Sequence, residues 1–488
     1  MVELHVVLTA WLALAAQPVV VAQDTHGHGH HPPPAAQHPP EQKAPMPAPK
    51  KKKRNQRTRA PAGPASAPDA HHQTPQQQAP APSGAAPTRA ETHPPRHTTM
   101  QMSGALGLHA MTREASGTSW QPDSTKHVMG HEMREGWMLS GHLMLNAVYD
   151  WQDGPRGDEK AFVNGMVMGV ARRDFESGDV LQLRAMLSPD PFMGKSGYPL
   201  LLAAGETADG VAPLVDRQHP HELFMELAAS FSHGVTDAER LFLYFGYPGE
   251  PAFGPPAFMH RASIMDSPEA PITHHWFDST HITFGVITAG WVHGGWKAEV
   301  SLFTGREPDE HRFDFDEAKF DSPSVRVSWN PDANWSLQAS WADLNSPEQL
   351  EPEIDSTRWS ASAIYNVPLA DQGWWTTTLI VGARDSTESE SQFALALESA
   401  YAPNRDWTLF GRGEIIETNE LSPGGGHGPI ETVGKFSVGA IRDFPVTESV
   451  RLGVGALYSV NFVPETLEPS YGGDPDGAMV FVRLVAGT

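Results

Sequence analysis

Beyond residue 136 the chain alternates tight and long connections between short runs of alternating apolar and polar residues. Period-two alternation gives a strand one apolar and one polar face. An up-and-down barrel of the bacterial outer membrane has this asymmetry, with short periplasmic turns and long external loops. The tight joints are 176–178, 234–237, 294–295, 331–334, 403–405 and 445–447; the long ones are 189–221, 248–280, 305–322, 344–356, 419–433 and 464–477.

Sixteen candidate strands follow from this rhythm. In 391–398, for example, Phe393, Leu395 and Leu397 share one face, and Glu398 lies on the other. Residues 199–203 are apolar enough to be a further strand, so fourteen or eighteen strands remain alternatives. The sixteen begin near Trp137, Ala161, Asp179, Glu222, Ala238, His281, Trp296, Pro323, Trp335, Thr357, Gly373, Ser391, Asp406, Gly434, Val450 and Ala478.

A soluble β-sandwich would show the same alternation, but two features favour a barrel. Trp or Tyr lies near many strand ends, as interfacial aromatic girdles require. An even number of strands also brings both ends of the barrel to the periplasmic side, which suits an N-terminal tail. We therefore predict an all-β, antiparallel, up-and-down transmembrane barrel over 136–488, in the outer membrane of a Gram-negative-type bacterium. Its expected partners are outer-membrane lipid and the barrel-assembly machinery.

Three segments are expected before the barrel. Residues 1–22 are apolar and end in small residues, which indicates a secretory signal, with a short membrane anchor as the alternative. Residues 23–100 are rich in Pro, His and Lys, too polar to fold, and are expected to be a disordered tail. Histidines in this tail could bind metal, or the tail could be a polar tether. Residues 101–135 are expected to be a plug-like or periplasmic segment.

The charge distribution separates the tail from the body. Residues 1–100 hold 10 Lys or Arg against 5 Asp or Glu, and the rest hold 25 against 53. An acidic body argues against a nucleic-acid partner and favours cations. The chain has no cysteine, which excludes disulfides, thiolate metal sites and cysteine-based catalysis.

Histidines and acids concentrate in the long connections. The spacing of His219 and His221 places both imidazoles on one side of an extended chain, which a metal can use. The alternative is that these side chains hydrogen-bond inward-folded loops to the barrel wall. Candidate metal ligands here are His219, His221, His260, His274 and His275, and candidate constriction residues are Asp216, Glu222, Arg261 and Asp278.

A second group of candidate ligands lies on the polar face of the first three strands, where Met138 and Met186 also lie. The candidate ligands in this group are His142, Met144, Met166 and Met168. Thioethers and imidazoles on adjacent strands are the ligands that Cu(I) or Ag(I) prefers. The alternative is that flexible methionines pack a plug against the wall.

Motifs of the common enzyme classes are missing from the sequence. It contains no Gly-rich phosphate loop, nucleophile elbow or zinc-protease helix motif. We therefore predict that the protein is not an enzyme, has no catalytic residues and requires no cofactor. If the protein binds an ion, we expect it to be Cu or Ag.

The long motifs DRQHPHELFM (216–225) and ITHHW (272–276), with four others, resemble a family of bacterial outer-membrane β-barrels whose function is unassigned. Some members occur beside copper or heavy-metal resistance genes, which implies a metal-related role. The layout of a His- and Met-rich tail before a barrel is also similar to the copper-resistance outer-membrane protein B family, although no motif is shared. The resemblance covers roughly 105–485, through MTREASGTSWQPDS (111–124), SGYPLLL (196–202), DRQHPHELFM (216–225), ITHHW (272–276), DSTHITFG (278–285) and GREPD (305–309).

The sequence thus predicts an outer-membrane channel or binding protein for small polar solutes or cations, with copper or silver as candidate metals. Two alternatives remain at this stage. One is a structural or metal-sequestering barrel whose lumen is filled by loops, and the other is an outer-membrane enzyme that modifies lipid or polysaccharide. The sequence leaves the solute and the oligomeric state open.

Overall fold

The computed structural model describes residues 103–126, 129–387, 389–422 and 427–487, which belong to one compact unit, His93–Thr488. The predicted signal segment 1–22 and tail 23–100 lie outside the described residues. The wall strands are β2 (Trp137–Gln152), β3 (Glu159–Asp174), β4 (Val180–Leu187), β7 (Phe224–Gly234), β8 (Glu239–Gly246), β9 (Val286–His293), β10 (Trp296–Phe303), β11 (Ser322–Trp329), β12 (Trp335–Leu344), β13 (Ser356–Pro368), β14 (Trp374–Ser386), β15 (Gln392–Ala402), β16 (Trp407–Thr418), β17 (Glu431–Pro445), β18 (Val450–Phe462) and β19 (Asp476–Ala486).

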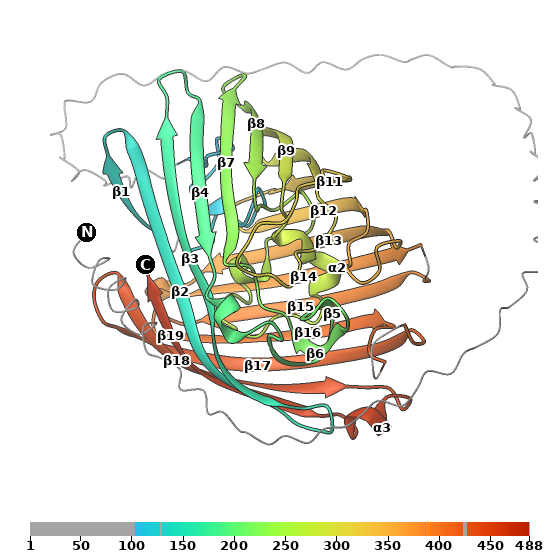
Figure 1. The fold of residues 1–488 in the computed structure, drawn as a ribbon. Coiled ribbons are helices and arrows are strands. Elements are labelled where there is room, and N and C mark those ends of the chain that lie inside the picture. The colour runs from blue at the N-terminus through green and yellow to red at the C-terminus, as the bar shows by residue number, and fades with distance from the viewer. Residues whose placement is uncertain (1–102, 127–128, 388, 423–426, 488) are drawn as a thin grey trace, which may run out of the picture. The chain divides into compact units, whose positions relative to one another are not determined.

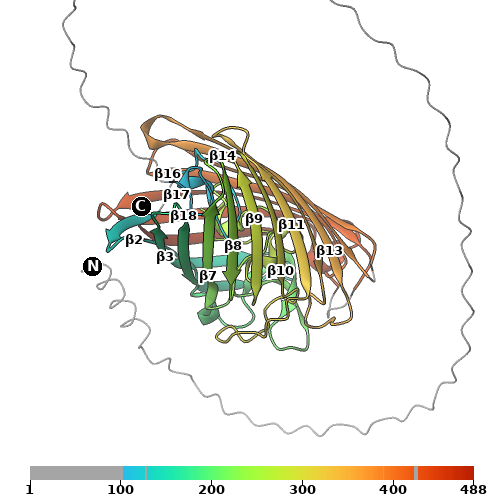
Figure 2. The same ribbon diagram turned by 90° about the horizontal axis from the view of Figure 1, so that it is seen from above.

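These sixteen strands form a closed antiparallel barrel, which confirms the predicted fold class (Figures 1 and 2). Each wall strand pairs with the next along the chain, and β19 returns to pair with β2 from Gly477–Gln152 to Ala486–Leu143. Closure leaves no edge strand with unpaired backbone groups, so the wall can lie in lipid. The predicted strand starts at Trp137, Trp296 and Trp335 agree with the structure.

Alternation along each strand separates an apolar exterior from a polar interior. In β15, Phe393, Leu395 and Leu397 are exposed, whereas Gln392 and Glu398 are buried. The exterior carries the aromatic side chains that membrane interfaces favour. Exposed examples are Tyr149, Trp151, Trp291, Trp296, Trp329, Trp335, Trp359, Trp375, Tyr401, Trp407 and Tyr458.

Two long connections fold inside the wall. Residues 188–223 form a hairpin of β5 (Tyr198–Thr207) and β6 (Pro213–Gln218), which is a separate two-stranded sheet, so 199–203 is a strand but not a wall strand. Residues 247–285 contain η3 (Phe258–His260), α2 (His274–Phe277) and η4 (Ser279–His281). Figure 1 shows β5, β6 and α2 within the ring of strands. Further short elements are η1 (Met111–Arg113), β1 (Gly130–Arg134), η2 (Asp190–Met193), η5 (Ala370–Gln372) and α3 (Glu468–Tyr471).

The predicted strand start at His281 is wrong. His281 ends η4, and β9 begins at Val286. The inner connection continues past His281, and its residues Thr280 to Thr283 are buried. A local hydrogen bond holds them, in which the Thr283 hydroxyl donates to the Thr280 carbonyl over 3.0 Å. The apolar and polar residues around 281 alternate as in a strand, yet both sets are buried.

The inner connections and the wall share one hydrophobic cluster. Leu200 and Leu201 of β5 pack with Trp276 and Phe277 of α2, and all four are buried. Wall residues such as Ile380 complete the cluster. Burial on this scale fixes the inner connections against the wall. No helix among the described residues is long and apolar enough to cross a membrane.

Residues 103–126 also lie within the barrel, near the tight turns. Trp120 and Leu106 pack against Phe242 and Val292 of the wall. Asn330, in the tight turn after β11, donates its side-chain amide to the Gln121 carbonyl over 2.9 Å. The segment therefore occupies the interior at the tight-turn end.

Candidate functional site

Five histidines from the two inner connections meet in the barrel interior. His219 and His221 directly follow β6, His274 and His275 open α2, and His281 closes η4. All five are buried. The structure thus brings together four of the five histidines predicted as loop ligands and adds His281.

The spacing of the rings suits a shared metal ion. Ring centres are 5.0 Å apart for His274 and His281, and 5.2 Å apart for His221 and His281. Those of His219 and His274 are 5.9 Å apart. Two imidazoles on one tetrahedral metal, with metal–nitrogen bonds of about 2.0–2.1 Å, place their ring centres roughly 5 Å apart. Two pairs of rings match this spacing, His274 with His281 and His221 with His281.

Oxygen atoms hold one nitrogen of each of these three rings. His221 Nδ1 lies 2.8 Å from Asp190 Oδ2, and His274 Nδ1 lies 2.7 Å from Asp278 Oδ1. His281 Nδ1 lies 2.6 Å from the Asp278 backbone oxygen. Metal-binding histidines typically give their second nitrogen to such an acceptor, which orients the ring.

The opposite nitrogens of His221 and His281 are buried without a hydrogen-bond partner. An unpartnered polar atom in a protein interior is costly, and a bound ion or water is a common explanation. Nε2 of His219 lies 3.1 Å from Glu206 Oε1 but without hydrogen-bonding geometry. The two unpartnered nitrogens of His221 and His281 belong to rings whose centres lie 5.2 Å apart.

Burial keeps two of the five imidazoles, those of His219 and His281, in the neutral form that metals bind. Burial, with Arg312 adding to it, lowers the pKa of His219 well below its ordinary value. Burial, with His274 and His221 adding to it, does the same to the pKa of His281. Neutral imidazole is the ligand form, so no proton needs to leave before a metal binds at neutral pH. We call His219, His221, His274, His275 and His281 the histidine chamber.

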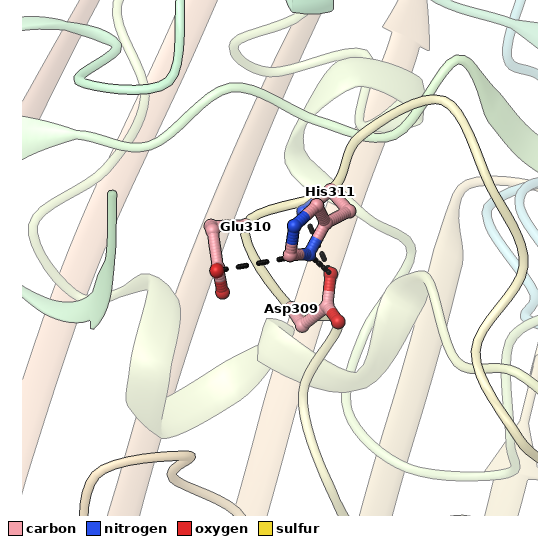
Figure 3. A group of neighbouring side chains, drawn as sticks. All are labelled: Asp309, Glu310 and His311. Carbon is pink, nitrogen blue, oxygen red and sulfur yellow. Dashed lines mark hydrogen bonds and ion pairs between the residues drawn. The ribbon is translucent and has the colours of Figure 1, made fainter. Parts of the chain in front are cut away.

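The histidine chamber is not a closed coordination shell. Within the described part of the chain, the groups of three His, Asp or Glu whose ligand atoms all lie within 4.8 Å of one another are Asp309–Glu310–His311 and Asp309–Asp314–Asp316. Both lie in the connection between β10 and β11, and Figure 3 shows the first. Hydrogen bonds within this loop account for its geometry, because Asp309 Oδ1 accepts from the His311 backbone over 2.6 Å.

The predicted constriction residues fall in three places. Asp278 lies beside the histidine chamber, where its carboxylate contacts the His274 ring nitrogen Nδ1. Arg261 forms a two-pronged ion pair with Glu398 of β15, at 2.7 Å for each contact, and lies 3.3 Å from Asp278. This pair joins the inner connection to the wall.

Asp216 and Glu222 lie outside the chamber. Asp216 accepts a hydrogen bond from Tyr471 over 2.9 Å and pairs with Arg156. Glu222 pairs with Arg312 at 2.8 Å. Burial raises the pKa of Glu222 to about 8, against the opposing effect of Arg312. These two acids bind the hairpin of β5 and β6 to neighbouring connections. They do not lie together around one constriction.

The last predicted histidine ligand, His260, is not part of the histidine chamber but lies beside it, because it borders one small cavity with His281. It borders a cavity with His142, Met144, Met166 and Met168, which are the wall ligands predicted from the first strands. The structure therefore separates the predicted ligands into two groups. His281 stands between them, because it borders a small cavity together with His260.

Acidic residues that the sequence reasoning missed line the external side of the histidine chamber. A cavity of about 300 Å³ is lined by Glu206, Glu348, Glu351 and Glu420, among others. Burial and the neighbouring Glu420 raise the pKa of Glu348 to about 7. Glu206 reaches from this cavity to His219. We call these four acids the acidic vestibule; their spacing along the chain gave no signal, because they come from three different connections.

Comparisons with known proteins found similarity only to solved structures, at low sequence identity. No family model matches the chain, and no curated protein matches it. Solved structures with a similar fold include an anion-selective porin from Comamonas acidovorans (10% identity, TM-score 0.45, covering 72% of this chain and 99% of that one). Others are Salmonella typhi OmpF in complex with daunomycin (12%, 0.47, 73% and 99%) and Pseudomonas putida OprB (9%, 0.46, 72% and 94%).

The closed barrel and its apolar, aromatic exterior identify the chain as an outer-membrane β-barrel, as predicted. The resemblance to a family linked with copper resistance stays a prediction. The predictions that the protein is not an enzyme and requires no cofactor also stay predictions.

Proposed function

We propose that the protein is an outer-membrane binding and passage protein for a transition-metal cation. The observation that carries this proposal is the histidine chamber, where His221 and His281 each have an unpartnered buried nitrogen and their ring centres lie 5.2 Å apart. Imidazole suits divalent zinc, copper and nickel. A porin-like barrel provides the route across the membrane, and the chamber provides the selectivity.

The order of ligands along the interior supports passage rather than storage alone. The acidic vestibule faces the external side, and a negative entrance raises the local concentration of cations. Glu206 joins the vestibule to His219, with 3.1 Å between Oε1 and Nε2. Beyond the chamber, His281 borders the cavity that holds His260. A cation therefore meets carboxylates first and imidazoles second.

Zinc uptake into liposomes tests the proposal. Full-length protein is refolded into vesicles that contain a zinc-sensitive dye, and external Zn²⁺ is varied. The double variant His221→Gln/His281→Gln removes both unpartnered nitrogens. We expect the saturable part of the uptake to be lost and the Zn²⁺ affinity to fall at least about tenfold.

His233→Gln is the matched control. His233 also contacts a carboxylate, with 2.7 Å between Nδ1 and Asp179 Oδ1, but it is 62% exposed at a tight turn. This control keeps any histidines of the N-terminal tail, so their background is the same in all samples. Equal Zn²⁺ affinity for the double variant and the control would rule out the histidine chamber as the site.

One observation favours a second candidate function, a metal-sequestering barrel. The inner connections pack against the wall in one hydrophobic cluster, and the cavities beside His281 and His221 hold only about 10 and 30 Å³. Such a protein would bind Zn²⁺ in the chamber and show no saturable uptake. The same liposome experiment distinguishes the two, because binding and uptake are measured separately.

A further inference from the structure

A second cluster of ligands, rich in methionine, lies beside the histidine chamber. Met144, Met166, Met186 and Met225 are four of the six buried residues in one packed group. Met168 and Met259 pack against them. We call these six methionines, together with His260, the methionine chamber.

Strand register explains how the wall methionines meet. Met144 of β2 lies opposite Met166 of β3, and Met168 of β3 lies opposite Met186 of β4. Residues directly opposite on antiparallel strands have neighbouring side chains. Met225 comes from β7, where the pairing with β4 shifts register after Met186. Such a bulge re-aims a side chain, and Met225 is completely buried.

The inner connection completes the chamber from the other side. Met259 and His260 lie on η3, and both border the small cavity that Met186 and Met225 line. Nε2 of His260 is buried without a hydrogen-bond partner.

The chamber opens toward the tight-turn end through a cavity of about 200 Å³. Met111, Met129, Met138 and Met265 add to its lining. Three of the arginines that line this cavity are paired with carboxylates. Arg483 pairs with Asp266 and Asp443, Arg451 with Asp406 and Arg184 with Glu226. An ion that leaves the methionines therefore reaches the periplasmic mouth of the barrel.

Packing alone does not explain this use of methionine. The main hydrophobic cluster lines the same barrel interior, and its buried members include one methionine, Met479, among Leu, Ile, Val, Phe, Ala, Tyr and Trp. Branched and aromatic side chains specify a core better than flexible methionine does. Of the methionines that the structure describes, only Met133, Met193 and Met479 lie outside the cavities described above.

We propose that the methionine chamber is a separate site for a soft monovalent cation, Cu⁺ or Ag⁺, held by thioether sulfurs and His260. Soft thioethers select such ions over divalent zinc. The site deepens the proposed function by adding a second class of metal, but the two sites share no ligand and can fail separately. The described route then runs from carboxylates through imidazoles to thioethers.

Silver binding to the full-length protein tests this proposal with a specific signal. Because the chain has no cysteine, every silver–sulfur contact must come from methionine. Silver nitrate is the probe, and X-ray absorption at the silver edge reports sulfur neighbours. We expect the variant Met144→Leu/Met166→Leu/Met186→Leu/Met225→Leu to lose most of the silver–sulfur signal and at least about tenfold in Ag⁺ affinity.

Three comparisons make the result decisive. Met479→Leu, a buried methionine in the other cluster, should keep the silver–sulfur signal of the parent. The quadruple variant should keep the parent's Zn²⁺ affinity, which separates this proposal from the histidine chamber. The double variant Met186→Leu/Met225→Leu supplies the test if the quadruple variant does not fold, since each Leu conserves volume. Unchanged silver–sulfur contacts in both Leu variants would overturn the proposal.

Discussion

The histidine chamber and the methionine chamber are neighbours built in opposite ways. The histidines come only from inner connections, and acids or carbonyls orient their rings, as Asp190 does for His221. The methionines come mainly from wall strands, and Met144 and Met166 are placed by strand register alone. An oriented imidazole group suits a divalent ion with defined geometry. An adaptable thioether group suits a soft ion with weak geometric demands.

This difference shows which part of the structure positions the ligands of each site. The wall holds Met144, Met166, Met186 and Met225 through its strand pairing, so these four methionines depend little on any loop, whereas Met259 and His260 lie on the connection 247–285. The histidine chamber depends on how the connection 247–285 is fixed inside the barrel. Arg261 and the Glu269–Arg412–Glu414 group join that connection to β15 and β16.

Breaking the Arg261 anchor should produce the largest effect. Arg261→Met leaves Glu398 and Asp278 buried without their partner, and breaking a buried ion pair typically costs about 3–5 kcal/mol. We expect the free energy of unfolding, measured by urea titration in detergent, to fall by this amount. Zn²⁺ affinity should fall with it, while wall methionines continue to give silver–sulfur contacts.

Arg442→Met is the control for this prediction, because Arg442 is exposed on β17 and should change stability by less than about 0.5 kcal/mol. Loss of both metals together in Arg261→Met would mean that the two chambers are one structural unit.

A smaller effect is expected from the acidic vestibule. Glu348 has a pKa of about 7, so it becomes charged as the pH rises through that value. Glu348→Gln should slow Zn²⁺ association a few-fold above about pH 7 and hardly at all below about pH 6. Stopped-flow measurements should show the difference shrinking at high salt, because salt screens steering. An equal slowing above about pH 7 and below about pH 6 would contradict a role for the Glu348 charge.

The sequence predicted the wall far better than the interior. Period-two alternation and turn residues located strands such as the one that begins at Trp137, since lipid outside and polar groups inside act on every wall residue. The same pattern failed at His281, because both faces of the inner connection are buried. Met144 and Met166 could be assigned to one face from their strands.

Contributions from loops were harder to foresee. Met225 depends on a local register shift, and Met259 depends on how η3 packs inside the barrel. Glu206 and Glu420 are far apart in sequence and meet only through long-range folding. Sequence spacing therefore identified ligand types, whereas tertiary packing decided which of them share a site.

Anomalous X-ray scattering from crystals soaked separately in Zn²⁺ and Ag⁺ tests the central claim most directly, because it locates each ion by element. We predict a zinc peak among His221, His274 and His281 and a distinct silver peak among Met144, Met166 and Met225. Both ions in one chamber, or peaks only at exposed positions such as the Asp309–Asp316 loop, would contradict the account.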